Sequence, residues 1–276
     1  MGPKTFIRIL DTLWNRCRYL RYLHRNQPIP FVFKSHTYYL HPDQSAIYHI
    51  ENSTAKIARM VDLIGSAPNY VFDVGAHCGL FSAFIAKKFP ECNIFCFEPS
   101  QELIPIINRN CPQCNLTIFN CAISDKDEHR TFYVNPKSQQ TNSLNEDAVT
   151  LFAAKDIVEK RTVRCRSLDS IAKEYNIKRV DVLKVDVQGF EGAVFRGAKA
   201  LLSTVEHLFI ESTWIDIESI TQIIPFALNY GFQYAAVINP VYMGADVLLS
   251  RQLIKHRKAV ELIFPLKEEL LTNRWR

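Results

Sequence analysis

The segment 71–89 most constrains how this chain can fold. An apolar run, Val71–Val74 with Asp73 inside it, leads into Gly75 and Gly79, and a second apolar run follows from Leu80 to Phe89. Gly75 can adopt the backbone angles of a sharp turn between a strand and a helix, and Gly79 lets the helix begin close to the sheet or to a ligand. The segment therefore predicts a β-strand, a tight turn and an α-helix that form a cofactor cradle.

The composition of this turn indicates which ligand it holds. A dinucleotide site more often shows Gly-x-Gly-x-x-Gly, with backbone amides and a helix dipole aimed at a pyrophosphate. This chain has Asp73-x-Gly75-x-x-x-Gly79 instead. Because it has fewer phosphate-binding glycines and one more negative charge, a cationic ligand without phosphate fits better. The pattern favours S-adenosylmethionine (SAM) over NAD, bound by Asp73, Gly75, Ala76 and Gly79.

Strands and helices are expected to alternate along the rest of the chain, as they do around a parallel sheet. The expected elements after the first helix are strand Asn93–Glu98, helix Gln101–Asn110, strand Leu116–Cys121, strand Val180–Asp186, helix Gly192–Leu202, strand Val205–Glu211, helix Ser219–Tyr230 and strand Phe232–Ile238. This order predicts an α/β fold with a doubly wound, mostly parallel sheet over residues 65–250. Residues 1–64 are expected to form an N-terminal helical extension, and 251–276 a C-terminal extension.

Residues 124–166 interrupt the alternation. Thr131–Val134 and Thr162–Arg166 are expected to pair as an inserted hairpin. The loop between them, Asn135–Lys160, is long and polar, so it fits either a lid that selects the substrate or an ordinary surface loop.

Polar residues follow the expected strands at the edge where open α/β sheets bind ligands. Glu98 comes 23 residues after Gly75, where a carboxylate can accept hydrogen bonds from both ribose hydroxyls. Pro99 then ends the strand. Asn120, Cys121 and Ala122 are expected beside the adenine, and Asp186 and Glu211 end two further strands. A solvated turn residue is the alternative role for Glu98.

Eight cysteines are spread along the chain without the density of a disulfide scaffold, which favours a reducing, cytoplasmic compartment. Cys92, Cys96, Cys111 and Cys114 have a spacing that suggests zinc. Cys96 lies within an expected buried strand, however, and a four-ligand site there would disrupt the sheet. Apolar packing is the preferred interpretation, and no metal site is predicted.

The basic charge of the chain is concentrated at its N-terminus. The net charge is +5, and residues 1–27 alone hold six basic residues against Asp11, so the remainder balances to zero. This argues against a nucleic-acid enzyme, whose catalytic domain would be basic. Residues 1–25 predict an amphipathic helix, which either packs on the domain or contacts an anionic membrane peripherally. No oligomeric state is predicted.

Four segments together carry a family resemblance. They are Val71-Phe-Asp-Val-Gly-Ala-His-Cys-Gly79, Phe97-Glu-Pro99, Arg166-Ser-Leu-Asp-Ser170 and, most selectively, Leu183-Lys-Val-Asp-Val-Gln-Gly-Phe-Glu191. In these the chain resembles the FkbM-type family of class I SAM-dependent methyltransferases. The resemblance implies a seven-stranded Rossmann-like sheet and conversion of SAM to S-adenosylhomocysteine (SAH). Gln188 is a departure, because the family often has Glu at this position.

Methyl transfer to a hydroxyl needs an in-line arrangement of acceptor, methyl and sulfur, and a base for the hydroxyl proton. Asp186 is the first candidate for this base, and binding the amino group of the cofactor is its alternative role. Glu191, Glu211 and His77 are further candidates. Lys184 is expected to pair with Glu211 structurally, or else to stabilise an oxyanion. The acids at this edge also fit a Mg²⁺-assisted reaction, although the sequence does not require the metal.

The function expected from the resemblance is O-methylation of a sugar or another small polar metabolite that carries a hydroxyl. N-methylation and methylation of a protein or lipid are alternatives within the same class. A non-catalytic module that binds SAM or a partner is the alternative from another class.

Overall fold

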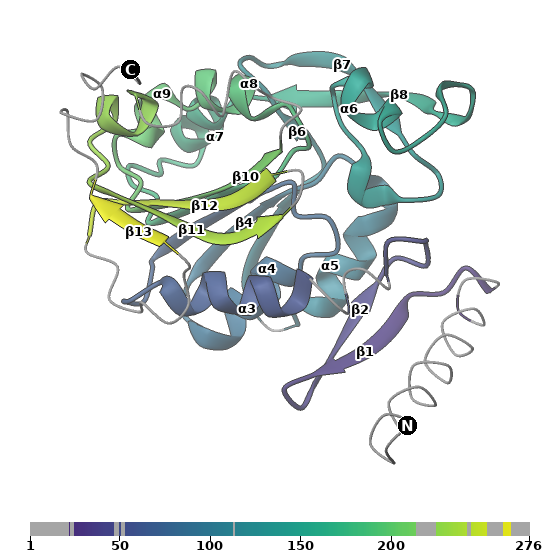
Figure 1. The fold of residues 1–276 in the computed structure, drawn as a ribbon, viewed down its shortest axis with the longest axis horizontal. Coiled ribbons are helices and arrows are strands. Elements are labelled where there is room, and N and C mark those ends of the chain that lie inside the picture. Colours follow the sequence, from purple (N-terminus) through teal and green to yellow (C-terminus); the bar gives the residue numbers. More distant parts are fainter. Residues whose placement is uncertain are drawn as a thin grey trace.

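The computed structural model describes residues 22, 25–46, 50, 53–112, 114–213, 225–241, 244–252 and 262–265 (Figure 1). Within these residues the main sheet has eight strands in the order β13-β11-β12-β10-β9-β3-β4-β5. The parallel strands are β3 (Tyr70–Val74), β4 (Asn93–Phe97), β5 (Asn115–Phe119), β9 (Val182–Val185) and β10 (His207–Thr213). The strands β11 (Tyr234–Val241), β12 (Gly244–Ser250) and β13 (Leu262–Pro265) extend it with antiparallel pairing.

The predicted doubly wound, mostly parallel fold is confirmed. The chain runs outward from β3 to β4 and β5, then returns to β9 on the other side of β3. The strand order therefore reverses between β3 and β9, which is where ligands of such sheets bind. The eighth strand, β13, lies at the sheet edge and comes from residues assigned to the C-terminal extension. Residues 219–224 of the predicted helix Ser219–Tyr230 lie outside the described residues.

Helices cover both faces of the sheet (Figure 1). The helices α3 (Thr54–Leu63), α4 (Leu80–Lys88) and α5 (Ile104–Asn110) enclose one apolar core, and α7 (Leu168–Glu174), α8 (Glu191–Arg196) and α9 (Lys199–Leu202) enclose the other. Successive residues of a strand point to opposite faces. Accordingly, Val71 belongs to the first core and Phe72 to the second, and both are fully buried.

The predicted inserted hairpin is confirmed. Strand β7 (Glu128–Val134) pairs with β8 (Glu159–Arg166) in antiparallel register, and Thr131 lies opposite Thr162. The short strand β6 (Ala122–Ile123) joins the other edge of β8. The loop between β7 and β8 is largely structured: it holds the 3-10 helices η3 (Gln139–Thr141) and η4 (Lys155–Ile157) and the helix α6 (Glu146–Thr150).

The predicted helical extension is wrong for residues 29–40. Strands β1 (Ile29–Phe33) and β2 (His36–Leu40) pair as an antiparallel hairpin instead. Apolar residues recur at every second position here, which is the period of a strand. Lys34 and Ser35 turn the chain with φ values of 45° and 65°, as a two-residue hairpin loop requires. Most of the amphipathic helix predicted over 1–25 lies outside the described residues.

None of the helices in the described ranges has the length and apolar character needed to span a lipid bilayer.

Asp181 aligns the starts of two neighbouring parallel strands. Its Oδ2 accepts hydrogen bonds from the amides of Asn69 and Tyr70 at 2.8 and 3.0 Å, just where β3 begins. Its Oδ1 accepts a third from Arg179 at 2.8 Å. Asp181 directly precedes β9, so one buried carboxylate sets β3 and β9 in register at their amino ends.

We expect Asp181→Ala to lower the free energy of unfolding by about 2–3 kcal/mol, because two backbone amides would lose their buried acceptor. Urea denaturation followed by circular dichroism measures this change. Asp156→Ala in η4 is the matched control, since Asp156 is exposed and should change stability by less than about 0.5 kcal/mol. Equal effects of the two substitutions would show that Asp181 does not hold the strands.

Candidate active site

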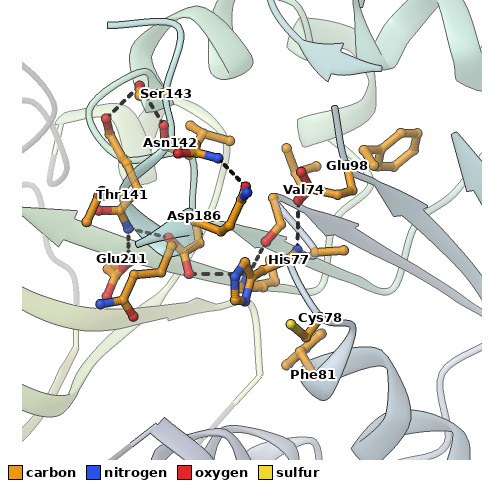
Figure 2. Close-up of a pocket in the computed structure, with 18 of the residues that line it drawn as sticks. Val74, His77, Cys78, Phe81, Glu98, Thr141, Asn142, Ser143, Asp186 and Glu211 are labelled. Atoms are coloured by element: carbon orange, nitrogen blue, oxygen red, sulfur yellow. Dashed lines mark hydrogen bonds and ion pairs between the residues drawn. The ribbon is translucent and has the colours of Figure 1, made fainter. Parts of the chain in front are cut away.

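A cavity of about 370 Å³ lies at the carboxyl ends of β3, β4, β9 and β10 (Figure 2). Residues at the ends of these strands and in the turns after them line it, and α3, the start of α4, β12 and the loop between β7 and β8 complete the wall. In Figure 2, Glu98 lies on one side, Asp186 and Glu211 lie toward the other, and His77 is between them. The cavity therefore has two polar ends, joined by the turn after β3.

Gly75 brings this turn against the ends of two neighbouring strands. Its φ of +73° is left-handed, and a Cβ atom there would lie 1.8 Å from the Asp186 carbonyl oxygen. The amides of Gly75 and Ala76 donate to the Phe97 carbonyl at 3.0 and 3.1 Å. Only glycine fits at position 75, and both Gly75 and Ala76 line the cavity.

Two residues that were predicted to bind the cofactor, Asp73 and Gly79, do not line the cavity. The Asp73 side chain is fully buried, and it accepts a hydrogen bond from the Ser82 hydroxyl of α4 at 2.7 Å. A Cβ atom on Gly79 would lie 3.0 Å from Ile107 of α5. The expectation is thus corrected: Asp73 points toward α4, and Gly79 permits a close approach to α5 rather than to a ligand or the sheet.

Glu98 is held in one orientation at the first end of the cavity. Its Oε2 accepts from the His77 amide and its Oε1 from the Ser100 amide, both at 2.8 Å. The side chain is buried, and burial raises the pKa of Glu98 to about 7 against the opposing effect of these two amides. Additional hydrogen-bond donors, such as a pair of hydroxyl groups, would stabilise the ionised form of this buried carboxyl group.

The residues predicted beside the adenine separate into two sets. Pro99 and Ala122 line the cavity, together with Ile123. Asn120 does not, because its side-chain amide donates to the carbonyls of Glu98 and Pro99 at 2.9 and 3.0 Å. Cys121 is buried in the core beneath α7 and α8. Asn120 therefore braces the turn that holds Glu98, and the adenine role predicted for Asn120 and Cys121 is corrected.

Lys184 is a buried cation on β9, directly beside Asp73 of β3. Its Nζ donates to the Gly75 carbonyl at 2.9 Å and lies 3.3 Å from Asp73 and 3.4 Å from Asp186. Burial opposes its charge, but Asp186 and Asp73 outweigh this and raise the pKa of Lys184. The predicted pairing with Glu211 is wrong. The strand register places Lys184 opposite Asp73 and beside Phe209, whereas Glu211 lies beyond the end of β9.

Asp186 and Glu211 lie together at the second end of the cavity, where the side chain of Gln188 bridges them. Burial disfavours the Asp186 charge, but Lys184, the bond with Glu211, and Lys56 hold the pKa of Asp186 well below its ordinary value. Burial and the neighbouring Asp186 raise the pKa of Glu211. Gln188 bridges the pair, since its Nε2 donates to Asp186 at 2.8 Å and to Glu211 at 2.7 Å. Of the two acids, Asp186 therefore stays ionised and Glu211 holds a proton more strongly.

Of the two other candidate bases, Glu191 lies outside the cavity lining and His77 belongs to it. Glu191 is buried outside the cavity lining, and its Oε1 accepts from the amides of Val187 and Gly189 at 3.2 and 3.3 Å. It fixes the turn after β9, so its predicted catalytic role is corrected. His77 does line the cavity, and burial lowers its pKa to about 4 although the Asp43 charge opposes this. The imidazole is therefore neutral at neutral pH.

The sequence interpretation missed two charged residues at the Glu211 end. Lys56 of α3 lies 3.3 Å from Glu211 and 3.2 Å from Asp246 of β12, and all three line the cavity. Helical periodicity of α3 contained no signal for Lys56, because its role depends on the packing of α3 against the sheet. Asp246 could have been identified from the register of β10 and β12, because it lies directly opposite Glu211.

The loop between β7 and β8 forms a wall of the cavity through residues 139–144. The Ser143 hydroxyl lies 3.1 and 2.8 Å from the carbonyl oxygens of Val187 and Gln188. At its other end the loop is tied to the N-terminal segment, because the backbone N–H of Gln139 donates a hydrogen bond to the Asp43 carboxylate at 2.9 Å. This wall is therefore fastened on both sides of the cavity.

Comparison with known proteins places these features in a family. The family described as the methyltransferase FkbM domain matches residues 73–234, more than half of the chain. Methyltransferase 1 of Beauveria bassiana is 26% identical over 144 residues, which are 47% of this chain and 58% of that protein. The 2-O-methyltransferase NoeI of Sinorhizobium fredii is 25% identical, covering 58% of this chain and 70% of that protein.

A third relative is the 31-O-demethyl-FK506 methyltransferase FkbM of Streptomyces tacrolimicus. It is 23% identical, over 64% of this chain and 77% of that protein. The chain thus spans less than two thirds of the length of the Beauveria relative and more than two thirds of the length of the two bacterial relatives.

We expect Gly75→Ala to destabilise the protein by about 2 kcal/mol or more, because it forces alanine into a left-handed conformation and against the Asp186 carbonyl. Thermal unfolding measures the loss. Gly65→Ala is the matched control, since a Cβ atom on Gly65 would meet nothing within 4 Å. A Gly75→Ala protein as stable as the control would contradict the close approach of the turn to Asp186.

Proposed function

Because this chain belongs to the methyltransferase FkbM domain family, we propose that it transfers a methyl group from SAM to a hydroxyl of a sugar or another small polar metabolite. The observation that carries the proposal is the cavity itself, with an oriented carboxyl group, Glu98, at one end and the Asp186 and Glu211 pair at the other. The names of the relatives that methylate oxygen support the choice of acceptor atom.

The residues of the cavity fit SAM. Glu98 would accept hydrogen bonds from the two ribose hydroxyls, while Pro99, Ala122 and Ile123 offer apolar contact to the base. The ionised Asp186 would attract the positive charge of the amino acid end. Bound SAM supplies an electrophilic methyl group on a sulfonium centre, and the chain would align the acceptor with it.

Glu211 would receive the proton of the acceptor hydroxyl. Asp186 is held ionised by Lys184, so it binds a proton weakly, whereas Glu211 has a raised pKa and is the better proton acceptor near neutral pH. Glu211 would take this proton in its ionised form, and the protonated carboxyl group would then donate a hydrogen bond to the ionised Asp186. This reverses the order of the two candidates that the sequence suggested. No step of this reaction requires Mg²⁺, so a metal-assisted reaction stays the open alternative that the sequence left.

The proposal is tested by methyl transfer itself. Purified protein would be incubated with methyl-labelled SAM and a panel of sugars and polyols, and labelled products and SAH would be followed by mass spectrometry. A protein that binds SAH but releases none from SAM with any acceptor would be the non-catalytic binding module. Methylation of an amine in place of a hydroxyl would identify an N-methyltransferase.

Binding of SAH should weaken as the pH falls through 7, because donors on the ribose favour the ionised form of Glu98, whose pKa is raised to about 7. Calorimetry should find affinity about tenfold lower at pH 6 than at pH 8, from the proton that must be released. Glu98→Gln should bind weakly at both values, with the pH dependence lost. A variant that keeps the affinity and pH dependence would remove the ribose role.

Asp186→Asn and Glu211→Gln should each lower the rate of methyl transfer by about 100-fold or more, since each removes a member of the proton-accepting pair. Affinity for SAH should fall far less for Glu211→Gln, which is the more remote from Glu98. Single-turnover rates and calorimetry measure the two quantities. If Asp186→Asn lowers both equally, Asp186 acts through cofactor binding alone and has no part in proton transfer to Glu211.

A further inference from the structure

Two charged residues at the acceptor end lie outside the part of the chain that matches the family. Lys56 precedes the matched residues 73–234, and Asp246 follows them. Both nevertheless reach Glu211, which lies inside the match: the Lys56 ammonium is 3.3 Å from Glu211 and 3.2 Å from Asp246. Segments on either side of the matched domain therefore complete the surroundings of Glu211.

The strand register explains why a cation is needed here. Glu211 of β10 and Asp246 of β12 are directly opposite each other in an antiparallel pair. Two like charges in such positions repel each other. Asp186 adds a third carboxyl group from the end of β9, and Gln188 bridges it to Glu211. The ammonium of Lys56 lies within ion-pair distance of two of these three groups, so it offsets the repulsion that the sheet geometry creates.

These residues face the cavity, unlike ion pairs that serve only the fold. Lys56, Glu211 and Asp246 all line it, together with Asp186 and Gln188. The Glu211 side chain retains 27% of its accessible surface, whereas Asp73, the structural partner of Lys184, retains none. An acceptor hydroxyl can therefore reach Glu211 while Lys56 stays in contact with it.

We propose that Lys56 and Asp246 are positioning residues that set the charge of Glu211, so that it can accept the proton of the acceptor hydroxyl. The inference rests on the proposed function, because it assumes the role of Glu211 given there. Neither residue needs to touch the reacting atoms. Lys56 favours the ionised form of Glu211, and Asp246 opposes it across the strand pair.

The charges around Glu211 give the two residues opposite effects. Glu211 is faced by Lys56 from α3, by Asp246 from β12, and by the residues at the end of β9, namely Lys184, Asp186 and Gln188. Loss of the Lys56 cation removes an attraction, so the pKa of Glu211 must rise. Loss of the Asp246 anion removes a repulsion and leaves Lys56 to Glu211 alone, so the pKa of Glu211 must fall.

The test is a pH titration of Glu211 in the SAH complex. Protein labelled with ¹³C at the glutamate carboxyl carbons would be followed by NMR, and the Glu211 signal would be assigned by its disappearance in Glu211→Gln. Lys56→Met should move the midpoint up by about one pH unit or more, and Asp246→Asn should move it down. A purely structural role would not produce shifts of opposite sign.

Two further variants are controls. Lys56→Arg keeps the cation and should retain the midpoint of the unchanged protein. Lys88→Met removes a lysine of α4 that pairs with Asp62 of α3 at 3.3 Å on the outer surface, and it should leave the midpoint unaltered. Unmoved midpoints in both Lys56→Met and Asp246→Asn, or shifts of the same sign, would overturn the proposal.

The titration also separates this inference from the function on which it rests. With an acceptor identified, the acidic limb of the kcat/KM profile should shift in the same directions as the NMR midpoints. If no acceptor is methylated, the proposed function fails, while the NMR titration still decides whether Lys56 and Asp246 control Glu211. If methylation occurs but the acidic limb stays fixed in both variants, the function stands and this inference fails.

Discussion

The cavity depends on one buried ammonium group. Lys184 lies on β9 beside β3, where an unpaired cation would be very costly, and its three contacts are to Asp73, to Asp186 and to the carbonyl of Gly75. These contacts join two strands and the turn between β3 and α4. They also hold Asp186 as an anion in a buried place. Gly75 makes the arrangement sterically feasible, because any side chain there would collide with the Asp186 carbonyl.

The two ends of the cavity differ in protonation because their partners differ. Glu98 is oriented by neutral backbone amides, which do not offset its burial, so its pKa rises to about 7. Asp186 is partly buried, but a full positive charge lies 3.4 Å away and its pKa falls. One end is therefore ready to gain stabilisation from hydrogen-bond donors. The other end carries permanent charge and suits a cation.

Local sequence patterns specified the sheet and the inserted hairpin well, because apolar runs of strand length, their alternation with helices and the turn at Gly75 are determined by short segments. The site was specified less well. Asp73 and Glu191 occupy strand and helix ends where acids often bind ligands, yet both side chains are buried against other parts of the fold: Asp73 bonds to Ser82 of α4, and Glu191 bonds to the amides of the turn after β9. Lys56 and Asp246 carried no motif, since their importance arises only from the packing of α3 and from the pairing of β10 with β12.

The wall formed by residues 139–144 belongs to an excursion between two hairpin strands, outside the main sheet. It is fastened through the Ser143 hydroxyl and the Gln139 backbone amide, and the side chains of Gln139, Thr141 and Asn142 add hydrogen bonds within the insertion and to Glu102. The wall is therefore built largely from the insertion's own contacts. A change in the insertion can reshape this wall while the strand ends that carry Glu98 and Asp186 stay where the sheet places them.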